Sequence, residues 1–206
     1  MRMEQRELNG ERLLGMKNRF LEVEIAPGVG GKVVSLRDAA TGYDFLWTNK
    51  DLPLKRLPVG SEYDPNFYGG IDELIPNDMP ETIDGVDAPD HGELWTRAMD
   101  WAAEGDRLVL SAVLPRCGLR YRRSISLCPD APALEIRYKI ENPTGERRSF
   151  LWKFHAALNI EPGDEILCPA GKAVAADPEW TRWQDCAPFD WPHVQGQRAD
   201  VVPSRD

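Results

Sequence analysis

Short apolar segments separated by turn residues restrict the fold of this chain more than any other feature of its sequence. Residues 20–25 (FLEVEI) alternate apolar and charged side chains. Apolar-rich segments recur at 106–115, 119–129 and 133–146, with Pro, Gly, Asn and Asp in the turns between them. Alternation with a period of two is typical of strands that bury one face. Because no segment keeps a period near 3.6, we expect an all-β antiparallel sandwich or barrel.

Two further stretches fit this pattern, and one long region interrupts it. Residues 30–47 predict a strand, a turn at Thr41-Gly42 and a second strand, and residues 147–162 continue the series. Residues 50–92 are rich in Pro, Asp and Gly, and the region is too long for a simple hairpin loop. Long structured loops often carry function, so we interpret this region as functional.

The C-terminal region shows no clear series of strands. Residues 171–206 contain Trp180, Trp183 and Trp191, and aromatic side chains at this density normally pack against a partner surface. A chain of 206 residues has the length of one large domain or two small ones. We interpret residues 1–206 as a single β-sandwich domain.

Charge and cysteine content exclude several classes of protein. The formal net charge of −9 opposes binding to nucleic acid or to an anionic membrane, although a local basic patch stays open. The four cysteines form no CxxC or CxxxC pair, which favours reduced thiols over a zinc site. The N-terminus has no apolar signal-peptide run, and no stretch approaches the roughly 18 apolar residues of a membrane helix. We therefore expect a soluble cytoplasmic protein.

The segment PDHGELW at 89–95 places His91 among carboxylates, between Asp90 and Glu93. Histidine is scarce, because His155 and His193 are the only others. A histidine in a polar cleft can donate a proton or a hydrogen bond near neutral pH. A structural reading is equally open, in which a loop histidine caps a backbone group.

His155 lies on an apolar segment, FLWKFHAALNI. If this segment is a strand, Lys153, His155 and Asn159 share one face, while Trp152 and Phe154 point to the other. A lone histidine on an apolar strand is often a satisfied core residue. The polar row nevertheless favours a position facing a cleft.

The carboxylates of Asp72 and Glu73 share the long functional region with His91. Together with Asp90 they could be imagined around a metal, but the spacing matches no metal-binding loop that we can defend, so we expect no metal. The sequence has no GxSxG, P-loop or HExxH motif, and GVGGK at 28–32 is better read as a glycine turn than as a phosphate loop. We expect no cofactor.

Four segments, in order, resemble the aldose 1-epimerase (galactose mutarotase-like) superfamily from about Asn18 to Ala170. They are NRFLEVEIAPGVGGKVVSLRDAATGYDFLW, GGIDELIPN, DHGELW and FLWKFHAALNI. The third resembles the family's His-Gly motif, and the fourth resembles its later strand with a second histidine. The resemblance implies a galactose mutarotase-like antiparallel β-supersandwich with a sugar cleft on its concave sheet. It also implies interconversion of the α and β anomers of a free aldose.

The resemblance assigns roles to individual residues. His155 would donate a proton to the ring oxygen of the sugar and retrieve it on closure, and His91 would give a supporting hydrogen bond. The substrate-binding residues that it suggests are Asn77, Asp72, Glu73, Glu93 and Trp95.

Two departures from the family pattern shape the functional hypotheses. Family members are longer and carry a glutamate base near the C-terminus, so we expect this domain to be incomplete there, or another carboxylate to substitute. The family's sugar-binding Asn-Arg pair is Asn77-Asp78 here, which predicts different substrate recognition.

Three functional readings remain. The leading one is an aldose 1-epimerase-like enzyme that acts by acid/base ring opening. The others are a non-catalytic carbohydrate-binding β-sandwich and a structural β-domain whose histidines are incidental. The expected partner is a small-molecule sugar, with no nucleic acid and no membrane, and a homodimer is a possible assembly.

Overall fold

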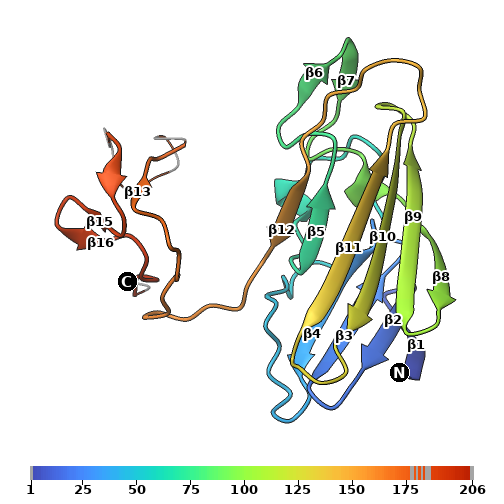
Figure 1. Ribbon diagram of the computed structural model, residues 1–206, viewed down its shortest axis with the longest axis horizontal. Helices are drawn as coiled ribbons and strands as arrows, with labels where there is room; N and C mark the ends of the chain where they lie inside the picture. Colours follow the sequence, from blue (N-terminus) through green and yellow to red (C-terminus); the bar gives the residue numbers. More distant parts are fainter. Residues whose placement is uncertain (1, 177–178, 180, 182, 184–186, 205–206) are drawn as a thin grey trace. The chain divides into compact units, whose positions relative to one another are not determined.

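The alternating segments form strands in a computed structural model, which describes residues 2–176, 179, 181, 183 and 187–204. A six-stranded antiparallel sheet has the order β1-β2-β3-β4-β5-β12, and a four-stranded antiparallel sheet has the order β11-β10-β9-β8 (Figure 1). The first sheet comprises β1 (Arg2–Leu8), β2 (Glu11–Lys17), β3 (Leu21–Ala26), β4 (Lys32–Asp38), β5 (Ile71–Leu74) and β12 (Lys153–Ala156). The second comprises β8 (Asp100–Glu104), β9 (Arg107–Leu114), β10 (Leu119–Leu127) and β11 (Leu134–Glu141). The prediction of an all-β antiparallel fold is confirmed.

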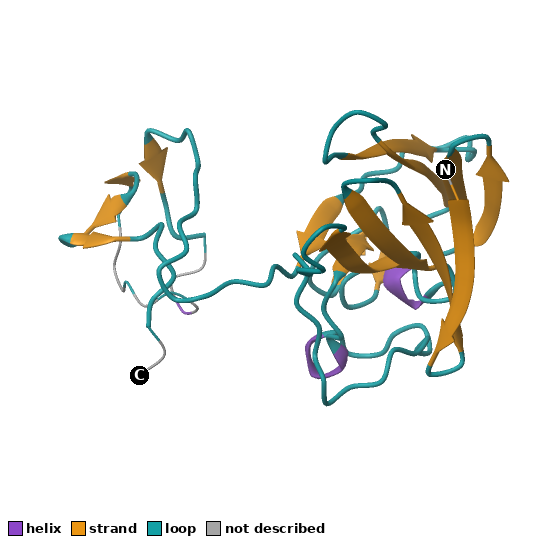
Figure 2. Cartoon of the chain, turned by 90° about the horizontal axis from the view of Figure 1, so that it is seen from below, coloured by secondary structure: helices purple, strands orange, loops and turns teal. Residues whose placement is uncertain are grey.

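The main hydrophobic core lies between the two sheets. Val23 and Ile25 of β3, Leu110 of β9 and Ile125 of β10 belong to one buried cluster. These strands place alternate side chains on opposite faces, so their apolar residues form one cluster between the two sheets. Figure 2 shows the strands in orange. Each such fully buried side chain contributes about 1.5–3 kcal/mol relative to an exposed one.

The first two strands were not predicted, because residues 2–17 are rich in charge. They form a hairpin in which Leu8 pairs with Glu11 across Asn9-Gly10. Both turn residues have positive φ, 53° at Asn9 and 84° at Gly10, as the two-residue turn of a tight hairpin requires. The Asn-Gly pair is the local signal that could have indicated this hairpin from the sequence.

The predicted turn at Thr41-Gly42 is present, since the Gly42 amide donates to the Asp38 carbonyl at 2.9 Å. The second strand expected after it does not form, and that part of the prediction is wrong. Residues 43–48 make isolated bridges instead, among them Leu46 with Leu158 and Thr48 with Gly69. Single bridges to several distant partners replace one continuous ladder.

The long region at 50–92 contains more regular structure than its composition suggests. It includes the 3₁₀ helix η1 (Asp64–Asn66), the strand β5, and a small hairpin of β6 (Glu81–Ile83) and β7 (Val86–Ala88). A second 3₁₀ helix, η2 (Leu94–Thr96), follows it. Because β5 joins β4 to β12, this region builds part of the larger sheet.

The chain divides into two compact units, Met1–Asn159 and Ile160–Asp206. The second unit contains two small ladders, β13 (Lys172–Ala173) with β14 (Phe189–Asp190) and β15 (His193–Val194) with β16 (Gln197–Arg198). Trp180, which was singled out from the sequence, and Cys186, one of the four cysteines, lie outside the described residues. The single domain over residues 1–206 stays a prediction.

Two further observations concern residues that the structure describes. Cys117, Cys128 and Cys168 are free thiols. The described residues contain no helix with the length and apolar character that a membrane crossing requires.

Candidate active site

The antiparallel pair β5 and β12 places Asp72 and His155 on the same face of the larger sheet. Asp72 is the register partner of His155, and Glu73 is the partner of Phe154. Neighbouring residues of a strand point to opposite faces, so Asp72 and Glu73 diverge although they are adjacent in sequence. The sequence-based expectation that Lys153 and His155 share a face agrees with their contacts. Lys153 Nζ donates to both Asp78 carboxylate oxygens at 2.9 Å, and His155 contacts Tyr63.

His91 is held beside this face by a strained turn. Its φ is 56°, and the following Gly92 has a φ of 77°. A Cβ on Gly92 would approach the Ile75 carbonyl oxygen to 2.2 Å, so only glycine fits here. The His91 amide donates to the Asp78 carbonyl at 2.8 Å, and the Glu93 amide donates to the Ile75 carbonyl at 2.8 Å. These backbone bonds fix the direction of the imidazole.

Tyr63 connects the two histidines. Its ring stacks on His91, with centroids 3.9 Å apart and planes 10° apart. Its hydroxyl lies 2.7 Å from Asp72 Oδ2 and 3.1 Å from His155 Nδ1. Its backbone amide donates to Asp90 Oδ2 at 2.7 Å, which ties the loop of Tyr63 to the loop of His91.

The two imidazoles lie close together. Their centroids are 6.4 Å apart, and their planes are inclined by 76°. Phe67 lies edge-on to His155 with centroids 5.2 Å apart, so an aromatic wall borders the pair. His155 is only partly buried beside this wall.

The two histidines have opposite electrostatic surroundings. Asp90 Oδ1 lies 2.7 Å from His91 Nδ1, and Asp78 Oδ1 lies 3.7 Å from His91 Nε2. Burial and the nearby Lys153 ammonium lower the pKa of His155, and the Asp72 carboxylate opposes this change only in part. The lowered pKa favours the neutral form of the His155 ring.

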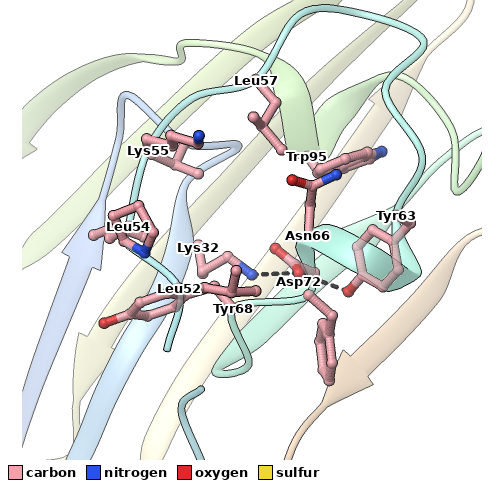
Figure 3. Close-up of a pocket in the computed structure, with 13 residues that line it drawn as sticks. Lys32, Leu52, Leu54, Lys55, Leu57, Tyr63, Asn66, Tyr68, Asp72 and Trp95 are labelled. Atoms are coloured by element: carbon pink, nitrogen blue, oxygen red, sulfur yellow. Dashed lines mark hydrogen bonds and ion pairs between the residues drawn. The ribbon is translucent and has the colours of Figure 1, made fainter. Parts of the chain in front are cut away.

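Asp72 is a buried carboxylate with a buried cationic partner. Lys32 Nζ donates to Asp72 Oδ2 and, at 2.9 Å, to the Gly69 carbonyl. Figure 3 shows Lys32 and the Tyr63 hydroxyl approaching Asp72 from opposite sides. A small cavity of about 50 Å³ adjoins these three residues and is also lined by Trp95 and Asn66.

Four of the residues suggested as substrate-binding have other contacts. Glu73 points between the sheets, where Arg123 and Tyr138 bind it. Glu93 is fully buried and accepts the backbone amides of Arg116 and Cys117 at 3.0 and 2.9 Å. These two carboxylates do not join the histidine pair.

Asn77 and Trp95 hold the His91 loop. Asn77 is fully buried, and its amide nitrogen donates to the carbonyls of Met79 at 2.8 Å and Pro89 at 2.6 Å. The indole of Trp95 donates to the Asp90 carbonyl at 3.1 Å and lies edge-on to Tyr63 with centroids 5.0 Å apart. Of the substrate-binding residues expected from the sequence, Asp72 is the one placed directly beside His155.

Sequence reasoning missed Tyr63, Lys32 and Phe67. Lys32 was assigned to a glycine turn, and the two aromatics lie in the long region without a motif of their own. The available signal was the position of Tyr63 and Phe67 just before the GGIDEL segment. Among the described residues, no group of three His, Cys, Asp or Glu side chains could hold a metal ion.

Comparison with solved structures identifies the class of fold. The chain is similar to a galactose mutarotase-like protein from Clostridium acetobutylicum, with a TM-score of 0.58 and 17% identity over 77% of this chain and 54% of that one. It is also similar to a candidate aldose 1-epimerase from Escherichia coli K12, with a TM-score of 0.63 and 16% identity over 92% of this chain and 66% of that one. A TPR-domain containing protein from Parabacteroides distasonis gives a TM-score of 0.64 and 21% identity over 91% of this chain and 30% of that one. The fold is thus a galactose mutarotase-like β-sandwich.

The family assignment follows from the sequence match. Residues 4–187 match the family model described as a domain of unknown function, DUF5107. The chain belongs to this family. It spans between 30% and 66% of the length of the three solved chains named above, and their low identity establishes the shared fold alone.

Proposed function

We propose that this protein is an aldose 1-epimerase-like isomerase, which interconverts the α and β anomers of a free sugar by acid/base ring opening. The observation that carries the proposal is the convergence of His91 and His155, whose ring centroids are 6.4 Å apart beside a buried carboxylate. Two groups that exchange protons must both reach one pyranose ring, and this separation suits them to contact its two sides.

The chemistry needs one proton acceptor and one proton donor. Ring opening removes the proton of the anomeric hydroxyl, protonates the ring oxygen and breaks the bond between C1 and that oxygen. Rotation about C1–C2 and closure on the other face of the carbonyl then give the second anomer. Histidine suits both tasks, because its pKa lies near the pH of operation. No redox step is needed, since the substrate and product are isomers.

The residue at position 78 predicts a sugar preference that differs from that of the galactose enzymes. Asp78 stands where the superfamily resemblance leads us to expect an arginine, and it is bound by Lys153. An acceptor in place of a donor should select a different pattern of sugar hydroxyls. A panel of aldoses is therefore the appropriate substrate set.

The test is NMR exchange spectroscopy or polarimetry on freshly dissolved α-glucose, α-galactose and other aldoses. We expect faster anomer exchange than in buffer for at least one sugar. His155→Ala should lower this rate by about 10²–10⁴-fold, the usual contribution of a positioned acid or base. His193→Ala is the matched control, because His193 lies exposed in the second unit, and it should leave the rate unchanged.

The alternative is a non-catalytic carbohydrate-binding protein on the same scaffold. The partly exposed ring of Phe67 beside His155 favours this reading, because an aromatic face can stack on a sugar. Retained sugar binding without acceleration across the panel would support it and contradict the isomerase. Equal losses in His155→Ala and His193→Ala would also contradict the role given to His155.

A further inference from the structure

The Tyr63 hydroxyl carries one proton and faces two possible partners. Asp72 Oδ2 lies 2.7 Å away and His155 Nδ1 lies 3.1 Å away. Asp72 is bound by the Lys32 ammonium, and an ionised carboxylate can only accept hydrogen bonds. Burial and the Asp72 charge raise the pKa of Tyr63, so its proton stays on the oxygen. Tyr63 therefore donates to Asp72.

This direction determines which nitrogen of His155 carries the proton. Since the Tyr63 proton points to Asp72, the Tyr63 oxygen can only accept from His155, and Nδ1 of His155 must be the N–H donor. The other nitrogen, Nε2, then carries a lone pair when the ring is neutral. Within the part of the chain that the structure describes, Nε2 makes no hydrogen bond, and the side chain is only half-buried.

The groups around His155 support the neutral ring. Lys153, Lys32, Asp72, Tyr63 and His91 are the titratable groups around it. Both lysines disfavour a positive charge on the imidazole, and the Asp72 carboxylate, which favours it, opposes them only in part. A neutral ring with a free Nε2 is a proton acceptor.

His91 has the opposite arrangement. Its Nδ1 donates to Asp90 Oδ1 at 2.7 Å, and its Nε2 faces Asp78 Oδ1 at 3.7 Å. A protonated His91 therefore meets a carboxylate at each ring nitrogen. The stacked Tyr63 ring covers one of its faces.

We propose that the chain Lys32–Asp72–Tyr63 fixes His155 with its proton on Nδ1, which makes Nε2 of His155 the base at the anomeric hydroxyl and His91 the proton donor to the ring oxygen. This inference rests on the proposed function and changes the roles that the superfamily resemblance implies, because His155 becomes the base instead of the proton donor and His91 becomes the proton donor instead of a supporting hydrogen-bond residue. It also supplies both proton-transfer groups from residues of the first unit, without a glutamate base.

The proposed step is balanced in both directions. His155 Nε2 takes the anomeric hydroxyl proton, the bond between C1 and the ring oxygen breaks, and His91 Nε2–H protonates that oxygen. The open-chain aldehyde then lies between a charged His155 and a neutral His91. On closure His155 returns its proton to the carbonyl oxygen, and His91 recovers the proton from the attacking hydroxyl.

Tyr63 acts in this scheme as a positioning residue, because it does not touch the sugar. Tyr63→Phe removes the acceptor at Nδ1 and leaves the tautomer of His155 unspecified. Tyr121→Phe is the matched control: Tyr121 is also fully buried, but it lies on β10 among the side chains between the sheets.

The first measurement needs no substrate. The full chain has three histidines, so a two-bond ¹H–¹⁵N spectrum of the protein labelled with ¹⁵N-histidine gives three ring patterns, which His91→Gln and His193→Gln assign. We expect His155 as the neutral Nδ1–H tautomer at pH 7 in the wild type and in Tyr121→Phe. In Tyr63→Phe we expect a mixture or the Nε2–H tautomer. A wild-type His155 that is Nε2–H or doubly protonated at pH 7 overturns the inference, even if Tyr63→Phe fails to fold.

The second measurement is the pH dependence of anomer exchange with the most reactive aldose. The rate should rise with pH as the same NMR signal reports deprotonation of His155, over the pH range in which the His91 signal still reports a protonated ring. Tyr63→Phe should lower kcat by about tenfold or more with little change in KM, whereas Tyr121→Phe should not. A rate that falls as His155 loses its proton overturns the base assignment. If no aldose reacts, the proposed function and the catalytic roles fail, while the spectrum still decides the tautomer.

Discussion

A buried ion pair between the two sheets provides the sharpest test of the energetics. The side chains of Glu73 and Arg123 are each 1% exposed, and Arg123 Nη1 lies 3.2 Å from Glu73 Oε1. Arg123 also donates to the Gly31 carbonyl, and the Tyr138 hydroxyl donates to Glu73 at 2.7 Å. We predict that Arg123→Met destabilises the protein by about 3–5 kcal/mol at pH 8, because it leaves Glu73 as an unpaired buried charge.

The destabilisation caused by Arg123→Met should increase as the pH rises. Burial raises the pKa of Glu73 above its ordinary 4.5, and Arg123 is the largest influence that lowers it again. Without Arg123 the folded-state pKa rises further. A carboxyl whose pKa is higher in the folded state binds more protons there, so stability falls as pH rises from 4.5 through the folded-state pKa. The cost of Arg123→Met should therefore be smaller at pH 5 than at pH 8, by up to about 1.4 kcal/mol per pH unit between the folded-state pKa of Glu73 in the wild type and its higher value in the variant.

The assay is urea unfolding of the full chain at pH 5 and pH 8, followed by circular dichroism. Arg122→Met is the matched control on the same strand, because its ion pair with Glu104 is about half exposed and should contribute about 1 kcal/mol or less. The double variant Glu73→Gln/Arg123→Met should recover part of the loss, since no buried charge remains. A cost below about 1 kcal/mol at pH 8, or one that does not change with pH, would refute the reasoning.

Two further substitutions test the His91 loop. Gly92→Ala should lower the free energy of unfolding by more than 3 kcal/mol or abolish folding, because the new Cβ would lie 2.2 Å from the Ile75 carbonyl oxygen. Gly85→Ala is the control, because Gly85 has the same φ of 77° but open space around it. It should cost about 1 kcal/mol in the same urea titration. Similar losses for the two variants would argue against the clash. Asn77→Ala should destabilise by about 1–3 kcal/mol, since the Met79 and Pro89 carbonyls lose a buried donor. Unchanged stability with weakened sugar binding would instead make Asn77 a ligand-binding residue.

The sequence predicted the fold well where strands bury one face and are exposed on the other. The segment 119–129 was expected as a strand, and β10 occupies Leu119–Leu127, where exposed Arg120 and Arg122 alternate with buried Leu119 and Tyr121. The alternation around His155 correctly placed Lys153 beside it. The charged hairpin of residues 2–17 was missed although β2 buries Leu13, Leu14 and Met16, because the adjacent Leu13 and Leu14 break the alternation with a period of two.

The candidate site was only partly predictable, for a physical reason. Asp72 and Glu73 are adjacent in sequence, and their side chains point to opposite faces only because both residues lie on the strand β5. The composition of residues 50–92 predicts a loop, so the sequence alone does not indicate that Asp72 faces the histidines and Glu73 faces Arg123. The contacts of Tyr63 with Asp72, His91 and His155 join segments far apart in the chain, and such tertiary pairings leave no local periodic signal.

His155 lies on a strand of four residues at the end of the larger sheet's strand order. Short terminal strands open locally at a lower free energy than the strands at the centre of a sheet. Mild denaturant or moderate heating should therefore detach β12 from β5 while the core between β3, β9 and β10 persists. Such fraying would separate His155 from Tyr63 and Asp72, and inactivation would precede global unfolding.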